Sequence, residues 1–118
     1  MPNLAPALRE RVTFARRVTI TDAYGATRGD WVDQFTVAAR IQPRLGGETV
    51  IAARLQGAQP VSITVRQSAY TREIDEGWRA MNARSGVVYA VHSLIDPDEH
   101  TADHGKFFEM LCETGVAA

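Results

Sequence analysis

Apolar and polar side chains alternate strictly over residues 61–66 (VSITVR). A period of two is typical of a β-strand that buries one face. A similar pattern is carried by Val12, Phe14, Val18 and Ile20 at even positions and by Trp31, Phe35, Val37, Ala39 and Ile41 at odd positions. Pro43, which cannot donate a ladder hydrogen bond, ends the stretch that begins at Trp31. These three stretches predict a chain that folds mainly as a sheet.

Further strands are predicted in the second half of the chain. Residues 78–82 and 87–95 form a predicted hairpin around a turn near Gly86, and residues 107–112 form a last strand with apolar side chains on both faces. In the first strand, two arginines at residues 16–17 interrupt the pattern and indicate a bend or an exposed edge.

The period changes over residues 46–57, where Ile51 and Leu55 stand four positions apart and Gly57 ends the pattern. This spacing predicts a short helix that needs a partner surface to be stable. Together, the segments predict a mainly β fold: a small antiparallel β-barrel or sandwich of about six strands, with one short helix inserted between strands 2 and 3.

Strand parity also predicts which side chains point inward. Both tryptophans, Trp31 and Trp78, are core candidates, but Trp78 follows a polar connection and could equally lie at the rim of an interface. The side chains expected in the core are Trp31, Phe35, Val37, Val61, Ile63, Val65, Tyr89 and Val91.

The length of 118 residues is that of one domain. We expect an N-terminal arm over residues 1–9, a single domain over residues 10–118 and a helix-bearing insertion over residues 45–58. The net charge of −1 argues against a protein that wraps nucleic acid. The chain has no continuous apolar run of the kind found in signal peptides or membrane spans, so we expect it to be soluble and intracellular when made, with no membrane association.

Two groups of residues could carry chemistry. Residues 96–104 hold four carboxylates and two imidazoles, but their spacing matches no metal-binding motif, so a solvated acidic loop without metal is the prediction. Cys112 is the only cysteine, and it stands at core parity, where a thiol behaves as a small apolar group. No phosphate-binding loop follows the glycines at residues 46–47. We therefore expect no catalytic residue, no cofactor and no enzyme activity.

Seven short segments carry a family resemblance by their order and spacing. They are residues 11–14 (RVTF), 21–25 (TDAYG), 31–33 (WVD), 39–43 (ARIQP), 87–91 (VVYAV), 94–99 (LIDPDE) and 107–113 (FFEMLCE). In this respect the chain resembles the phage head–tail joining (head closure, or stopper) family found in the necks of tailed phages and gene transfer agents. The resemblance implies a small β-barrel with a helix-bearing insertion between its second and third strands.

The resemblance also implies a function. Copies of the protein, a stopper or head completion protein, would form a homo-oligomeric ring between the portal adaptor, which is also a head completion protein, and the tail terminator, seal the DNA-filled head and dock the tail. DNA would pass through the channel without sequence-specific binding. The protein would be in the cytoplasm during assembly and then in the neck of the particle. The alternative is a free-standing small β-barrel module that binds a peptide or an oligonucleotide.

Contact surfaces are expected at exposed aromatic, aliphatic and arginine side chains. Arginine pairs well with carboxylates at interfaces, although the arginines of the first quarter could equally be solvated edges and turns. The candidate interface residues are Arg16, Arg17, Tyr24, Arg28, Leu45, Val50, Ile51, Arg54, Leu55, Tyr70, Arg72 and Trp78.

Overall fold

The computed structural model describes residues 8–44, 51–52, 55, 57–102 and 104–114. Its elements are β1 (Glu10–Thr21), β2 (Thr27–Pro43), β3 (Gln59–Arg66), the 3-10 turn η1 (Thr71–Glu73), β4 (Arg79–Asn82), β5 (Val88–Ile95) and β6 (Phe107–Thr114). The predicted mainly β fold is confirmed. Among the described residues, no helix has the length and apolar character needed to cross a membrane.

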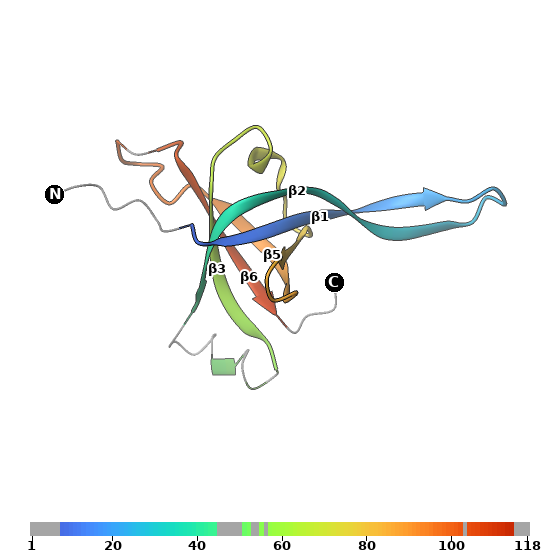
Figure 1. Cartoon of the computed structure of the whole chain (residues 1–118), viewed down its shortest axis with the longest axis horizontal. Coiled ribbons are helices and arrows are strands. Elements are labelled where there is room, and N and C mark those ends of the chain that lie inside the picture. The colour runs from blue at the N-terminus through green and yellow to red at the C-terminus, as the bar shows by residue number, and fades with distance from the viewer. Residues whose placement is uncertain (1–7, 45–50, 53–54, 56, 103, 115–118) are drawn as a thin grey trace.

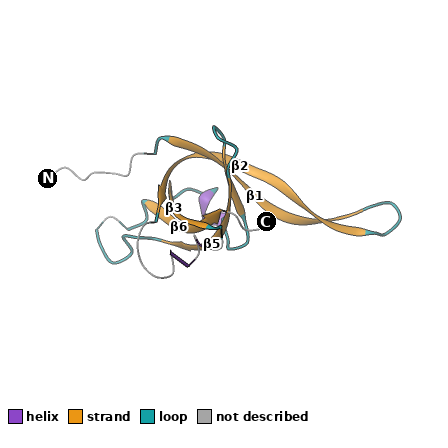
Figure 2. Cartoon of the chain, turned by 90° about the horizontal axis from the view of Figure 1, so that it is seen from below, coloured by secondary structure: helices purple, strands orange, loops and turns teal. Residues whose placement is uncertain are grey.

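All six strands pair antiparallel in the order β1-β2-β3-β6-β5-β4, and β4 returns to pair with β1, so the sheet closes into a barrel (Figure 1). In Figure 2 the strands curve around a common centre, and one end of the β1–β2 hairpin leaves the ring on one side. The turn of this hairpin is fixed by Asp22, whose carboxylate accepts hydrogen bonds from the backbone N–H groups of Tyr24 (2.8 Å) and Ala26 (3.0 Å). Gly25 adopts the positive φ of 81° that the turn requires.

The core follows the predicted parity in most strands. Ile63 is fully buried, and Phe35 and Val37 are partly buried against the core. The register predicted for β3 is therefore confirmed. The buried cluster consists of Val12, Phe14, Ala39, Val61, Ile63, Val65, Ile74, Trp78, Ala80, Tyr89, Val91, Met110 and Cys112.

The prediction that Trp31 belongs to this core is wrong, because β2 contains one extra residue. Phe14 pairs with Phe35, but the next residue of β1, Ala15, pairs with Asp33, so Gln34 has no partner on β1. A bulge of one residue inverts the side-chain parity beyond it. The side-chain amide of Gln34 donates to the carbonyl of Val32 at 2.9 Å and closes the bulge locally. Trp31 consequently lies outside the core cluster and is only half-buried.

Trp78 behaves in the opposite way. Its side chain is only 9% exposed and belongs to the core cluster. The ring meets Phe35 edge-on, with 6.1 Å between centroids, and Phe35 stacks on Phe14 at 5.5 Å. Of the two positions considered for Trp78, the core position is the observed one, so the aromatic side chains at the root of the β1–β2 hairpin form one packed group.

The predicted insertion is described only in part. Ile51, Ala52 and Leu55 are helical, whereas residues 45–50, 53–54 and 56 lie outside the described residues. Ile51 is 54% exposed and Leu55 is 84% exposed, so neither side chain contributes to the barrel core. At the base of the insertion, the backbone N–H of Arg44 donates to the carbonyl of Pro60 at 3.0 Å.

Ile63 and Trp31 were both predicted in the core, but only Ile63 lies there, so the stabilities of their alanine variants should differ. Replacing Ile63 with Ala removes fully buried methyl groups, so we expect the free energy of unfolding to fall by about 2–5 kcal/mol. Replacing Trp31 with Ala removes a half-buried ring outside the core, and we expect a loss of about 1 kcal/mol or less. Chemical denaturation of both variants measures the difference. A loss at Trp31→Ala as large as that at Ile63→Ala would contradict the assigned bulge.

Candidate assembly surfaces

The distal half of the β1–β2 hairpin projects from the barrel as a two-stranded ribbon, with its turn at the far end in Figure 1. Over the described residues, β4 pairs with β1 only at residues 12–15, and β3 pairs with β2 only at residues 39–43. Residues 16–32, called here the hairpin extension, therefore have strand neighbours only within the hairpin. Both outer edges present backbone groups that no strand covers, the arrangement by which a sheet recruits another chain.

One face of the hairpin extension continues the inner face of the barrel but covers no core. Direct cross-strand pairs share a face, and these pairs are Arg16 with Val32, Val18 with Asp30 and Ile20 with Arg28. Val18 and Ile20 are half-buried, and Val32 is 40% exposed. This face, called here the inner face of the hairpin extension, thus combines three apolar side chains with two exposed arginines and one carboxylate.

The opposite face is organised around Trp31. The guanidinium of Arg79 lies over the Trp31 ring, with its central carbon 4.9 Å from the ring centroid. Arg17 crosses the paired strand at Gly29, where a Cβ would collide with the guanidinium. The backbone N–H of Trp31 donates to the carboxylate of Asp30 at 2.9 Å. The contact between Arg79 and Trp31 joins β4 of the barrel to the root of the hairpin extension, and the other two contacts lie within the hairpin.

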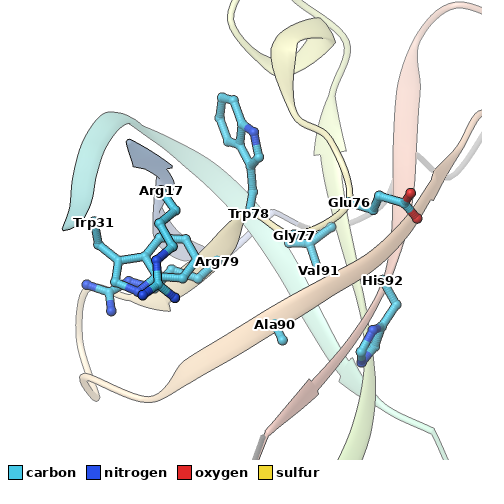
Figure 3. Close-up of a pocket in the computed structure, with 9 residues that line it drawn as sticks. All are labelled: Arg17, Trp31, Glu76, Gly77, Trp78, Arg79, Ala90, Val91 and His92. Carbon is cyan, nitrogen blue, oxygen red and sulfur yellow. The ribbon is translucent and has the colours of Figure 1, made fainter. Parts of the chain in front are cut away.

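A groove of about 460 Å³ lies at the root of the hairpin extension (Figure 3). Its floor consists of small or short side chains, Gly77, Ala90 and Val91. One wall carries Arg17, Trp31 and Arg79, and the other carries Glu76 and His92, with Trp78 between them. The groove therefore has cations along one side and a carboxylate along the other.

The turn that leads into this groove is acidic. Glu73, Asp75 and Glu76 are all exposed, and none of them forms an ion pair with another described residue. The ion pairs found within the described residues are Arg84 with Glu10, and His92 with Glu113 at 3.0 Å. We call residues 73–76 the acidic turn; its three carboxylates are available to a cationic partner.

The carboxylate-rich loop after β5 is held in place by hydrogen bonds to the Asp96 carboxylate. Asp96 accepts hydrogen bonds from the backbone N–H of Gly105 (2.8 Å), the backbone N–H of Asp98 (2.9 Å) and the side-chain amide of Gln67 (3.0 Å). The bond from Gly105 contributes most to holding the pKa of Asp96 below its usual value. The described residues contain no group of three side chains placed to hold a metal, and Asp103 lies outside them.

Cys112 is fully buried, and burial raises the pKa of its thiol to about 12. A thiol in this environment stays protonated at neutral pH and is a poor nucleophile. His92 lies on the surface, where its ring nitrogen contacts a carboxylate oxygen of Glu113 at 3.0 Å. The thiol therefore contributes to packing, and the imidazole to a contact on the surface.

Most of the candidate interface residues that the structure describes are exposed. Those that are exposed are Arg16, Arg17, Tyr24, Arg28, Ile51, Leu55, Tyr70 and Arg72. Trp78 is buried in the core, and Leu45, Val50 and Arg54 lie outside the described residues. Four of the exposed residues, Arg16, Arg17, Tyr24 and Arg28, belong to the hairpin extension, where they are spread from its root to its turn. The acidic turn was not predicted as a contact site, although its run of carboxylates at residues 73–76 was a visible signal.

The role of Asp96 gives a pH-dependent prediction. Because the folded state lowers the pKa of Asp96, its ionised form stabilises the fold above the ordinary pKa of 3.8, and this contribution is lost as the pH falls through the lower, folded-state pKa. We expect Asp96→Asn to be less stable than the wild type at neutral pH, with the gap narrowing below pH 3.8. Thermal unfolding across this range, with exposed Glu99→Gln as control, measures the effect. A gap that stays constant into acid would count against this role.

Comparison with known proteins identifies the family. A family model described as phage head completion protein matches residues 4–115. A chain in the virion of a native gene transfer agent (GTA) particle is similar at 19% identity, with 97% of this chain and 100% of that chain covered and a TM-score of 0.65. The solution structure of protein SF1141 from Shigella flexneri 2a is similar at 22% identity, with 94% and 96% covered and a TM-score of 0.64.

No curated protein matches the chain. The two solved structures are similar in fold, and the family match spans nearly the whole sequence. The family resemblance read from the seven short segments is thereby confirmed. The chain belongs to the phage head completion protein family, a family of structural proteins and not of enzymes.

Proposed function

We propose that this protein is the stopper of a phage or phage-like neck. Copies form a homo-oligomeric ring between the portal adaptor and the tail terminator, seal the DNA-filled head and dock the tail. The observation that carries this proposal is the family match over residues 4–115, which assigns the chain to the head–tail structural proteins and implies assembly with other structural proteins of the particle.

The solved relatives and the charge of the chain support the same role. The gene transfer agent chain comes from a virion, which supports a final location in the particle. In the proposed role, the protein is in the cytoplasm until it assembles. The net charge of −1 suits a channel wall that lets DNA pass without gripping it, because tight binding to DNA phosphates depends on a basic excess.

The barrel also presents separate surfaces for several partners. The hairpin extension leaves the barrel from β1 and β2, whereas the insertion leaves between β2 and β3. In the proposed arrangement, residues 1–9 form an arm, residues 10–118 form the ring-building domain, and the insertion at residues 45–58 faces the channel or the adaptor. The exposed Ile51 and Leu55 are the described apolar side chains that such a contact would bury.

The insertion supplies the test of this role. Removing residues 46–57 and joining the ends with a short turn keeps the contact between Arg44 and Pro60, so we expect a folded barrel. Particles made with this variant should contain filled heads that leak DNA or lack tails, as should particles made without the protein. Electron microscopy and infectious or transducing titre are the measurements. Normal tailed particles from the variant would remove the insertion from the mechanism, and normal particles without the protein would refute the proposed function.

The isolated protein should be monomeric at micromolar concentration. Its adaptor and tail partners provide the template for the ring, and each contact between copies is small, so association alone does not offset the lost translational and rotational entropy. Sedimentation velocity of the purified protein measures its state, and addition of the adaptor ring should move it into a larger complex. A stable closed ring of the isolated protein at micromolar concentration would contradict assembly on a template.

A further inference from the structure

The hairpin extension is an incomplete structure within one copy. A two-stranded ribbon is marginally stable by itself in water. Its inner face carries the half-buried Val18 and Ile20 and the exposed Val32, and among the described residues no other strand pairs with its outer edges. Such a face and such edges are what a ribbon offers to a partner that covers it.

The charges of the same face indicate what covers it. Arg16 and Arg28 point to the same side as the three apolar side chains, and neither forms an ion pair with a described residue. The acidic turn of the barrel carries three exposed carboxylates that are also free of such pairs. The remaining charge of the face, Asp30, has possible partners in Arg79 on the opposite wall of the groove and in the exposed Arg72 next to the acidic turn.

The groove beside the acidic turn also fits the ribbon in shape. Its floor of Gly77, Ala90 and Val91 leaves room for the branched side chains Val18 and Ile20. Six paired residues per strand make the ribbon about 20 Å long, which is comparable with the shortest dimension of the molecule, 28 Å. Glu76 belongs both to the groove lining and to the acidic turn, so a ribbon that lies in the groove also meets the acidic turn.

The other acidic segment of the barrel is a poorer acceptor. In the loop after β5, Asp96 is already engaged by three hydrogen-bond donors of its own barrel. That loop also carries His100 and His104 among its carboxylates. None of the described residues of that loop lines the groove. The acidic turn is therefore the better match for the two arginines.

We propose that the hairpin extension of one copy docks on the groove and acidic turn of a second copy of this chain. Two different surfaces meet in such a contact, so it is heterologous and generates a ring when the rotation between copies closes. The inference deepens the proposed function and rests on its ring, but the contact itself is measurable in purified protein without any particle.

A spin label on the hairpin extension tests the contact. Thr19 is exposed on the face opposite to the docking face, and the native Cys112 is buried, so Thr19→Cys takes a nitroxide at one position. Labelled protein is mixed with an equal amount of ¹⁵N-labelled wild type at about 1 mM, where weak contacts are populated. We expect the nitroxide to broaden the indole N–H signal of Trp78 and the amide signals of Gly77 and Ala90 in the other copy.

Charge reversal shows whether the named residues hold the contact. Arg16→Glu with Arg28→Glu in the labelled copy, or Glu73→Arg with Glu76→Arg in the ¹⁵N copy, should weaken association roughly tenfold or more and abolish the broadening. Combining the two reversed proteins should restore it, because opposite charges then face each other again. Glu99→Arg, an exposed acid outside the groove, should leave it unchanged, and a preserved amide spectrum verifies the fold of each variant.

The outcomes separate the contact from the function. Absent broadening, broadening centred on another surface such as the loop after β5 or the hairpin extension itself, or broadening that survives both reversals would overturn the docking inference. None of these results depends on particles. Normal particles assembled without the protein would instead refute the neck function, whatever the spectra show.

Discussion

The architecture of this molecule depends on a difference in strand length, because β1 and β2 are longer than the strands that pair with them. β1 has 12 residues and β2 has 17, whereas β4 has four. β4 can therefore close the barrel only at residues 12–15 of β1, and the remainder of the hairpin extends beyond the closed sheet. A closed sheet hides its edges, but the part that projects cannot. The same two strands thus supply one wall of the core and a ribbon with open edges.

The sequence predicted the barrel well where its pattern was strict. Residues 61–66 alternate without exception, and the buried Ile63 confirms the register that this alternation predicts. The prediction for Trp31 is wrong because the side-chain parity of a strand predicts its buried face only while both paired strands advance residue by residue. The extra residue at Gln34 interrupts this one-to-one pairing, and a bulge has no fixed signature in a single sequence. Tertiary pairing, rather than local pattern, decided the position of this side chain.

The candidate surfaces were predictable to a smaller extent. The arginines at 16, 17 and 28 stand out by residue type, and the pairing of β1 with β2 places Arg16 and Arg28 on one face of the hairpin extension and Arg17 on the other. The acidic turn was treated as an ordinary polar connection, because carboxylates in a loop are usually solvated or paired within the fold. Only the folded chain shows that Glu73, Asp75 and Glu76 form no ion pair with the described residues, and that Glu76 lines a groove. The distinction between a solvated charge and an available one is a property of three-dimensional proximity.

A small docking contact between copies has a further physical consequence for assembly. A ribbon about 20 Å long buries little surface, so one contact between free copies does not overcome the entropy lost on association. In the proposed assembly, copies held side by side on an adaptor ring would meet at a high effective concentration, where the same contact would form readily. In the proposed arrangement, the hairpin extension of each copy docks on one neighbour, and its groove binds the hairpin extension of the other. Closing the ring therefore fills the last free groove with the last free hairpin extension. Weak contacts of this kind restrict ring formation to the template, because a partial ring in solution always leaves one ribbon and one groove unfilled.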